Sequence, residues 1–225
     1  RHGADRVLTG FPGVLGEGRD RRAEWVGNPL RGAIEAAAPP EERFAGRAGP
    51  LKVLVVGGSQ GALALNEAVP QALALMPGDA RPLVTHQAGE RHIDALSDAY
   101  ARAGVVAECL PFIDDIARRY AEADVVVCRS GATTIAELAA VGVASLLVPF
   151  PHAADDHQVD NARVLERHGA AEMWLQRDLT AARLAGWLGA LDRGRLLRMA
   201  VAARALRKTG ATRRVAELCL ELAAR

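Results

Sequence analysis

The sequence contains few cysteines, few aromatic residues and no long apolar run. Its three cysteines, Cys109, Cys128 and Cys219, stand far apart, so a disulfide-stabilised scaffold is excluded and reduced thiols are expected. No apolar run approaches the roughly 20 residues that a membrane-spanning helix needs. No signal peptide is recognisable, and the chain opens at Arg1 without a methionine, so we expect that residues preceding it in the natural protein are missing.

Lysine is almost absent and the charges nearly cancel. Lysine and arginine together number 28 against 27 acidic residues, the net charge is +1, and the only lysines are Lys52 and Lys208. The abundance of arginine and alanine is typical of codon bias, and no basic stripe alternates with aromatic residues, so no nucleic-acid partner is expected. Half of the 225 residues are hydrophobic, which is enough for one large α/β domain or for one domain and a fragment of another.

The stretch 123–138 places a buried strand, a tight turn and a helix start in direct succession. Three consecutive valines are typical of a strand covered on both faces. Ser130-Gly131 then forms the turn, and Thr133 or Thr134 is expected to cap a helix that carries Glu137. Helix amides suit a phosphate and a carboxylate suits a sugar diol. Since open α/β sheets bind ligands beyond their strands' carboxyl ends, the stretch predicts a site for a nucleotide or nucleotide sugar.

The first 50 residues show a different pattern from the rest. Residues 6–11 predict a short strand, which must pair with the rest of this chain or with a preceding domain, because a lone strand cannot form a sheet. Residues 25–31 contain turn residues followed by Arg31 at the start of a short helix. Residues 36–50 hold three prolines, two glycines and several charges, and we interpret them as an interdomain linker.

From residue 52 onward, apolar segments with strand character alternate with helical segments. The predicted strands are 53–56, 82–86, 105–110, 123–128, 144–149 and 171–174. This alternation predicts an α/β fold, a Rossmann-like parallel sheet with helices on both faces. The end of the chain, 180–224, is predicted to be helical. We therefore expect residues 1–50 to be a domain remnant with its linker, and residues 51–225 to be one Rossmann-like domain with C-terminal helices.

A glycine-rich loop, Gly57–Gly61, directly follows the strand KVLVV and precedes a helix. Glycines let the backbone approach a phosphate closely, and Ser59 adds a hydroxyl donor at the helix N-terminus. The NAD fingerprint needs glycines where Ser59 and Ala62 stand, and a Walker loop needs Gly-Lys-Ser/Thr, so both motifs are missing. The loop is either a phosphate site or a plain tight turn.

Other polar residues also have a structural alternative. A glutamate such as Glu137 in the first turns of a helix is favoured by the helix dipole alone. In segment 152–161, Asp155 and Gln158 have capping-box spacing, so Gln158 could reach back to the helix N-cap. The acids and histidines there match no standard ligand set, so no metal is expected. His86 ends a strand on the ligand side, where a lone histidine is more often a structural hydrogen-bond partner than a catalyst.

Five motifs, in this order, resemble the C-terminal half of the bacterial MurG family. They are WVGNPLR (25–31), GGSQGALALN (57–66), HQAGE (86–90), PFIDDIARRYAEADVVVCRSGATTIAELAAVG (111–142) and VPFPHAADDHQVDNARVLERHGAA (148–171). Members of this family are undecaprenyl-diphospho-muramoylpentapeptide β-N-acetylglucosaminyltransferases of peptidoglycan synthesis. The resemblance implies a GT-B glycosyltransferase, in which two Rossmann-like domains face each other and the C-terminal one holds UDP-GlcNAc.

The resemblance also implies how the phosphates are held. Ser59 resembles the family's diphosphate contact. Arg31 matches the arginine of the GNPxR motif, whose guanidinium can offset charge on the UDP leaving group. Supporting contacts, mostly backbone amides, are expected from Gly58, Gln60, Gly61, Ser130 and Gly131.

The same resemblance implies contacts to the uracil, the ribose and the sugar. Ile113 matches the position whose backbone groups recognise the uracil edge, and Phe112 is expected to form a wall of that pocket. Glu137 matches the ribose-binding carboxylate. Gln158 matches a glutamine that holds hydroxyls of GlcNAc, and His157 stands where some members have a second glutamine.

No catalytic residue is expected in this chain, since the family's N-terminal domain carries the lipid I cleft, the proposed general base and the membrane-facing patch. Residues 1–11 resemble only the last strand of that domain. We therefore expect this chain to bind UDP-GlcNAc without a cofactor, and to transfer the sugar to lipid I only with that domain present. The full-length enzyme is expected in the cytoplasm, peripheral on the inner face of the plasma membrane.

Two alternatives from other classes stay open at this point. A UDP-GlcNAc 2-epimerase-like isomerase also uses a GT-B fold, but would need catalytic acids from both halves. A non-catalytic nucleotide-sugar-binding module would bind without turnover. An NAD dehydrogenase is a distant further interpretation, weakened because Ser59 and Ala62 replace the fingerprint glycines.

Overall fold

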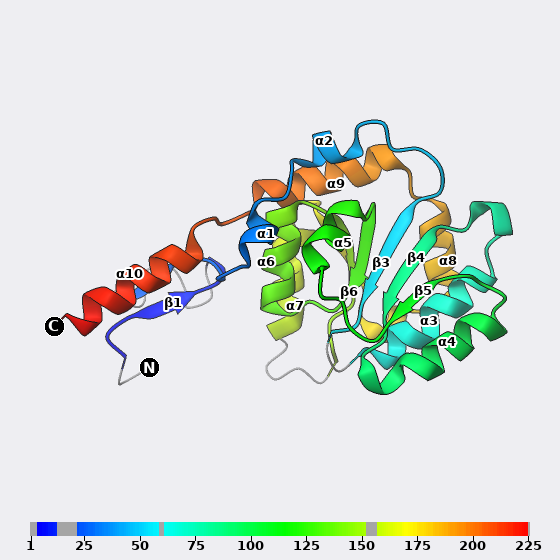
Figure 1. Ribbon diagram of the computed structural model, residues 1–225, viewed down its shortest axis with the longest axis horizontal. Helices are drawn as coiled ribbons and strands as arrows, with labels where there is room; N and C mark the ends of the chain where they lie inside the picture. The colour runs from blue at the N-terminus through cyan, green and yellow to red at the C-terminus, as the bar shows by residue number, and fades with distance from the viewer. Residues whose placement is uncertain (1–3, 13–21, 59–60, 152–156, 225) are drawn as a thin grey trace.

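The computed structural model describes residues 4–12, 22–58, 61–151 and 157–224, and a six-stranded sheet forms its centre (Figure 1). The strands are β3 (Lys52–Val56), β4 (Leu83–Gln87), β5 (Glu108–Leu110), β6 (Val125–Cys128), β7 (Ala144–Leu147) and β8 (Ala171–Met173). Their order is β5-β4-β3-β6-β7-β8, and every pairing is parallel. The predicted Rossmann-like α/β fold and its six strands are confirmed. The strand predicted at 105–110 is shorter, because Val106 is 95% exposed in the loop before β5.

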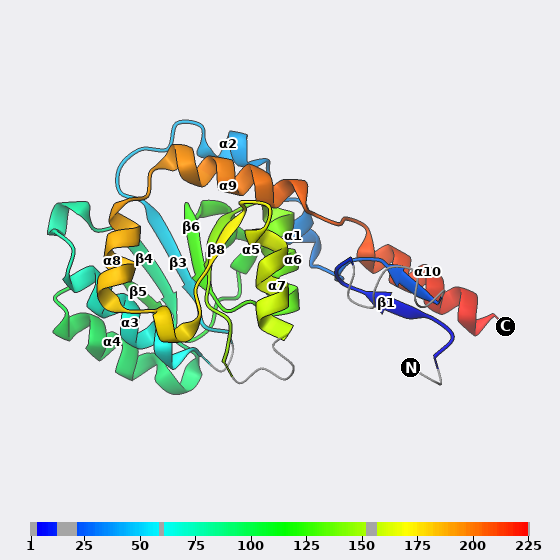
Figure 2. The same ribbon diagram turned by 180° about the vertical axis from the view of Figure 1, so that it is seen from behind.

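Helices cover both faces of this sheet (Figures 1 and 2). One face carries α3 (Leu63–Ala74), α4 (Ile93–Arg102) and α8 (Ala181–Gly189). The other carries α5 (Ile116–Glu122), α6 (Ala132–Val141) and α7 (His157–Glu166). Helix α9 (Arg193–Ala205) contributes to both hydrophobic clusters. The alternation along β3 explains the two layers, because Val53 and Val55 enter one cluster and Leu54 enters the other.

The valines of β6 are buried as predicted. Val125, Val126 and Val127 are each at most 1% exposed. β6 pairs with β3 on one side and β7 on the other, and the two hydrophobic clusters cover its faces. The strand therefore ends in a fixed position, which also fixes the turn that follows it.

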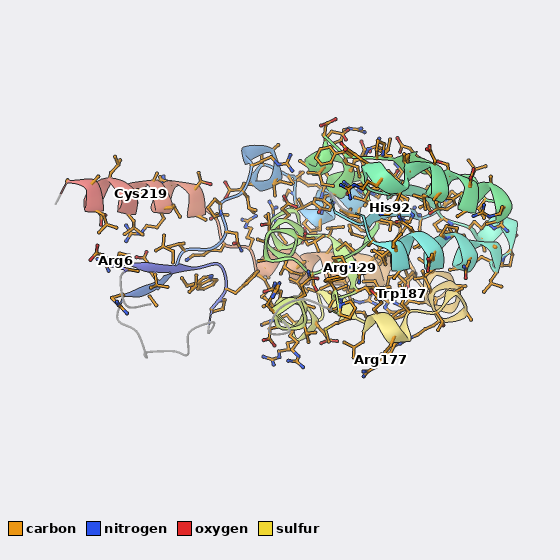
Figure 3. The ribbon with its side chains drawn as sticks, turned by 90° about the horizontal axis from the view of Figure 1, so that it is seen from below. Arg6, His92, Arg129, Arg177, Trp187 and Cys219 are labelled. Carbon is orange, nitrogen blue, oxygen red and sulfur yellow. The ribbon has the colours of Figure 1, made fainter. Side chains whose placement is uncertain are left out.

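The N-terminal strand pairs with a second strand that the sequence did not predict. β1 (Val7–Thr9) runs parallel to β2 (Ala23–Trp25). Helix α10 (Ala211–Ala223) lies beside this pair, away from the main sheet (Figures 1 and 2). Arg214 of α10 donates two hydrogen bonds, of 2.6 and 2.9 Å, to the carboxylate of Glu24. Arg6 and Cys219 mark this part in Figure 3. The first strand thus docks on the rest of this chain.

The segment interpreted as a linker contains a helix that packs on the domain. It follows α1 (Gly32–Glu35) and includes α2 (Pro40–Phe44), which packs along α9 (Figure 1). Arg43 donates to the carbonyl oxygens of Ala121 and Val141, both at 3.0 Å, and to that of Gly142. The prolines of the segment are compatible with this helix, because Pro40 occupies the first helical position, where proline is favoured.

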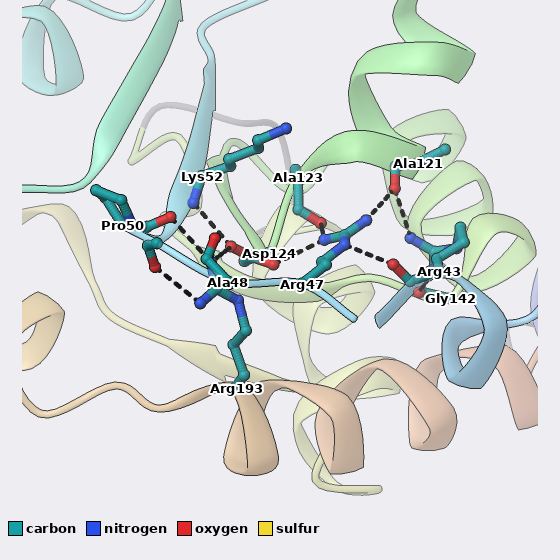
Figure 4. A network of polar contacts seen from close by, with 11 residues as sticks. Arg43, Arg47, Ala48, Pro50, Lys52, Ala121, Ala123, Asp124, Gly142 and Arg193 are labelled. Atoms are coloured by element: carbon teal, nitrogen blue, oxygen red, sulfur yellow. Dashed lines mark hydrogen bonds and ion pairs between the residues drawn. The ribbon is translucent and has the colours of Figure 1, made fainter. Parts of the chain in front are cut away.

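A buried carboxylate joins this segment to the sheet (Figure 4). Asp124, just before β6, is fully buried, and its Oδ1 accepts from Arg47 at 2.7 Å. Its Oδ2 accepts from the backbone N–H of Lys52 at 2.8 Å and from Arg193 of α9 at 3.2 Å. The network ties three segments together at the amino ends of β3 and β6. None of the helices in the described ranges is long and apolar enough to cross a membrane.

Candidate functional site

The described site residues predicted within the domain follow the carboxyl ends of four parallel strands. Gly57–Gly58 follows β3, Phe112-Ile113 follows β5, Ser130-Gly131 follows β6 and His157-Gln158 follows β7. Because the strands run in one direction, their carboxyl ends meet at one edge of the sheet. The strand order switches between β3 and β6, and ligands of open α/β sheets bind at such a point. Arg129, which directly follows β6, is labelled near the centre of Figure 3.

The described glycines of the glycine-rich loop, Gly57, Gly58 and Gly61, lie between β3 and α3. Gly61 has a φ of +75°, and a Cβ there would lie 2.1 Å from the carbonyl oxygen of Ala88. A Cβ at Gly57 would lie 2.7 Å from the amide nitrogen of Ala62. Gly58 has a φ of +82° and open space around it, so its glycine is needed for its backbone conformation alone. The two remaining predicted contacts of this loop lie outside the described residues: Ser59 and Gln60.

Glu137 points out of the second turn of α6 and is largely buried. Its side chain is 13% exposed, and its Oε2 accepts a 3.3 Å hydrogen bond from the hydroxyl of Tyr120. Burial raises the pKa of this carboxyl, and the Tyr120 hydrogen bond and the charge of Arg31 oppose that rise. The prediction that Thr133 or Thr134 caps α6 is wrong, because both lie inside the helix and Gly131 is its N-cap.

Arg31 reaches the same place from the N-terminal part of the chain. It is the N-cap of α1, which packs against α6. Its guanidinium nitrogen lies 3.9 Å from Oε1 of Glu137, and its side chain is 62% exposed. Because the guanidinium is exposed and the distance is long, the pair contributes little to stability. The arginine is therefore available to an anion at the edge of the sheet.

The Ser130 turn is fixed by contacts with α7. The hydroxyl of Ser130, fully buried, donates to the carbonyl oxygen of Gln158 at 2.8 Å. The carbonyl oxygen of Ser130 accepts from the side-chain amide of Asn161 at 3.1 Å. The side chain of Gln158 accepts through Oε1 from the backbone N–H of Phe150 at 3.0 Å. Asp155, its expected capping-box partner, lies outside the described residues.

The two residues predicted to face the uracil differ in exposure. Phe112 is 50% exposed, whereas the side chain of Ile113 is buried against the core next to Ile116. The contact to uracil that the family resemblance implies for Ile113 is made by its backbone and does not require the buried side chain. His157 is exposed at the first position of α7.

Sequence reasoning gave no role to Tyr120 or Arg129. Tyr120 is buried on α5, and its spacing of four from Ile116 marks it as a core residue without revealing the partner of its hydroxyl. Arg129 donates to the carbonyl oxygen of Val148 at 3.0 Å and to Oε1 of Gln176 at 2.7 Å. Its contacts tie the ends of β6, β7 and β8 together.

The structural alternative for His86 is confirmed. The residue is fully buried, and its ring nitrogens lie 2.9 Å from the hydroxyl of Tyr100 and 3.1 Å from Oδ1 of Asn66. Burial lowers the pKa of His86 to about 3, so the ring is neutral at physiological pH.

Three cavities lie away from the predicted site. One of about 330 Å³ opens near the amino ends of β3 and β4, with Lys52 and Arg119 in its wall. A second, of about 450 Å³, lies between α3 and α4, and a third, of about 240 Å³, lies beside Trp25. None of these three has a predicted site residue in its wall. The predicted residues form an open edge, as one wall of a cleft would.

Comparison with known proteins decides the family. Residues 52–217 match the model of the glycosyltransferase family 28 C-terminal domain. The chain belongs to glycosyltransferase family 28. Family relatives from Aromatoleum aromaticum and Azoarcus sp. are each 61% identical over 98% of this chain, which spans 63% of their length. Both are named UDP-N-acetylglucosamine--N-acetylmuramyl-(pentapeptide) pyrophosphoryl-undecaprenol N-acetylglucosamine transferase.

Solved structures agree with the family 28 assignment. Acinetobacter baumannii MurG is 36% identical with a TM-score of 0.77, and the match covers 90% of this chain and 58% of that one. The glycosyltransferase of kitacinnamycin is 24% identical with a TM-score of 0.63, covering 96% and 55% of the two chains, and shows a shared fold. The resemblance to MurG and the predicted GT-B type of domain are confirmed.

Proposed function

We propose that this chain binds UDP-GlcNAc at the carboxyl edge of its sheet, as the donor half of an inverting transferase that converts lipid I into lipid II. The observation that carries the proposal is the pairing of Glu137 with Arg31 beside the start of α6, 3.9 Å apart. A recessed carboxylate next to a cation and helix amides suits a molecule with both a diol and phosphates. The relatives' names supply the identity of the donor.

In this proposal Glu137 holds the ribose. Its two oxygens accept from the two adjacent ribose hydroxyls, which requires the ionised form. The hydroxyl of Tyr120 already donates to Oε2, which orients the carboxylate and favours its charged state. Desolvation makes each of these hydrogen bonds stronger than an exposed one.

The diphosphate lies between the glycine-rich loop and Arg31. Gly61 packs closely against the loop of Ala88, and we place a phosphate beside the first amides of α3. Arg31 offsets the negative charge that grows on UDP as the bond to the sugar breaks. Ser59, Gly58 and Gln60 provide the remaining donors of the loop.

The uracil and the sugar take the flanking positions. The backbone of Ile113 reads the uracil edge, and Phe112 forms a wall of that pocket. Gln158 accepts from the N–H of Phe150 through Oε1, so its amide nitrogen donates to a hydroxyl of GlcNAc. His157, at the start of α7, faces the same sugar, and the turn at Ser130 and Gly131 closes the pocket.

Transfer itself needs a second substrate and a base. An inverting displacement requires the acceptor hydroxyl and its base to lie within about 3 Å of each other and of the anomeric carbon. We assign lipid I and the base to the part of the relatives' length that this chain does not span. The full-length protein would then act at the cytoplasmic face of the membrane.

Calorimetric titration tests the donor assignment. The chain should bind UDP-GlcNAc and bind UDP-GalNAc and NAD much more weakly. Glu137→Ala should lose about 1–3 kcal/mol of binding free energy, since two ribose hydroxyls lose their acceptor. Glu172→Ala is the matched control, because Glu172 is also a partly buried carboxylate paired with an arginine, on the edge strand β8. Equal losses in the two variants would refute the role of Glu137.

A product assay separates the proposed activity from the alternatives. Incubated with UDP-GlcNAc and lipid I, the chain alone should make no lipid II. Formation of lipid II would contradict the assignment of the base to another segment. Release of UDP and ManNAc would instead identify a 2-epimerase.

A further inference from the structure

Behind the glycine-rich loop, three buried polar side chains form a continuous hydrogen-bonded row. The row runs from Tyr100 on α4 through His86 on β4 to Asn66 on α3, with contacts of 2.9 and 3.1 Å. It ends at the carbonyl oxygen of Ala88, which accepts from the side-chain amide of Asn66 at 3.2 Å. All four residues are less than 9% exposed.

The chemistry of the groups fixes the direction of every hydrogen bond. The carbonyl of Ala88 can only accept, so Asn66 presents its NH₂ group to it and its Oδ1 to the histidine. Oδ1 can only accept, so His86 donates from Nε2. Because His86 is neutral, its Nδ1 carries no proton and accepts from the hydroxyl of Tyr100. Each contact of the row therefore joins one donor to one acceptor, and the hydrogen bonds run in a single direction, from Tyr100 to the carbonyl oxygen of Ala88.

The row ends at Ala88, where the loop after β4 contacts the glycine-rich loop at the edge of the sheet. A Cβ added at Gly61 would lie only 2.1 Å from the carbonyl oxygen of Ala88. Ala88 is itself held by its N–H, which donates to the carbonyl oxygen of Leu110 at 2.9 Å. Asn66 lies in the first turns of α3, directly after the loop. A displaced Asn66 would move both the helix start and the Ala88 carbonyl against which Gly61 packs.

We propose that Asn66, His86 and Tyr100 are positioning residues for diphosphate binding at the glycine-rich loop, because they hold the start of α3 and Gly61, the last residue of that loop, against Ala88. They act through these backbone segments and do not touch the ligand. The inference rests on the proposed function, which places the diphosphate at that loop. Phosphate recognition by backbone amides depends on fixed orientation, so a small shift of the loop reduces affinity.

The test compares UDP with uridine, which lacks the phosphates. Tyr100→Phe removes one hydroxyl and keeps the ring, which lies edge-on to His86 with centroids 5.8 Å apart. Asn66→Ala removes the link to the Ala88 carbonyl. Both variants should lower the affinity for UDP about tenfold, the effect of one buried hydrogen bond, and leave uridine within about twofold. Ser145→Ala is the control, since it also removes a buried hydroxyl, on β7, and should change neither affinity.

Each outcome decides the matter. A selective loss of UDP affinity supports the positioning role, since a role in folding alone would not change the ratio of the two ligands. Unchanged UDP binding, or equal losses for UDP and uridine, overturns the inference while the proposed function stands. If the unaltered chain binds neither ligand, the proposed function is refuted, and this inference with it.

Discussion

Replacing Asp124 with alanine should remove a large part of the stability of this domain. The carboxylate is fully buried and accepts from two guanidinium groups and one backbone N–H, at distances between 2.7 and 3.2 Å. The side chains of Arg47 and Arg193 are only 16% and 24% exposed. Removal of the Asp124 carboxylate leaves these two guanidinium groups without their counter-charge. Breaking a buried pair in this way typically costs about 3–5 kcal/mol.

The contacts that survive place the expected loss near the lower end of that range. Arg47 keeps hydrogen bonds of 2.6 and 2.9 Å to the carbonyl oxygens of Ala121 and Ala123. Arg193 keeps bonds of 2.8 and 2.9 Å to the carbonyl oxygens of Gly49 and Pro50. We therefore expect Asp124→Ala to lower the free energy of unfolding by about 3 kcal/mol, a large share of the roughly 5–15 kcal/mol of a typical domain.

Urea denaturation of Asp124→Ala measures this loss, with Asp115→Ala as the matched control. Asp115 pairs with Arg118 on α5, where the two side chains are 44% and 54% exposed, so its removal should cost far less than the removal of Asp124. The dependence of unfolding free energy on urea should keep its slope in both variants. Losses of equal size in the two variants would refute the reasoning that burial makes the Asp124 network strong.

Three further predictions follow from the site. Gly61→Ala should destabilise the chain by about 2 kcal/mol more than Gly58→Ala. Both glycines have a positive φ, but only Gly61 packs against a backbone carbonyl. Urea denaturation measures the free energies of unfolding of the two variants. Burial lowers the pKa of His86 to about 3, so between pH 6.5 and pH 3 His86 binds a proton in the unfolded chain but not in the folded one. The contribution of the neutral His86 to stability is therefore complete above pH 6.5 and falls by about 1.4 kcal/mol per pH unit below pH 6.5. Unfolding at pH 7 and pH 5 should show a weaker pH dependence in His86→Gln, and an unchanged one would contradict the buried neutral ring. Tyr120→Phe removes a hydrogen bond that lowers the pKa of Glu137, so Glu137 should take up a proton at higher pH. The pH at which the chain loses affinity for UDP should then rise, which binding titrations between pH 5 and 8 measure. An unchanged pH dependence would contradict the proposed ionised state of Glu137.

The main sheet was predictable because its strands have local signatures. Runs such as Val125 to Val127 are β-branched and covered on both faces, and Gly142 ends α6 with a φ of +70°. β2 was missed because its three residues include Glu24 and adjoin a turn, so no local pattern marks it. Its pairing with β1 and the bond from Arg214 exist only in the folded chain.

The residue types of the proposed site are recognisable in the sequence, whereas its geometry is less so. The glycines and Glu137 stand out, because the turn after a strand and the start of a helix restrict which residues fit. The approach of Arg31 depends on the packing of α1 against α6, which no local pattern encodes. The contact of Tyr120 with Glu137 likewise joins two helices, so the sequence marks the tyrosine only as buried.

Hydrogen exchange with and without UDP-GlcNAc locates the ligand on the chain, so it separates binding at the carboxyl edge of the sheet from binding elsewhere. We expect slower amide exchange after β3, β5, β6 and β7, in segments 57–66, 112–113, 130–137 and 157–158. Protection should be absent around the cavity near Lys52 and Arg119, at the opposite edge of the sheet. Protection confined to that cavity, with the carboxyl edge unchanged, would contradict the proposed donor site.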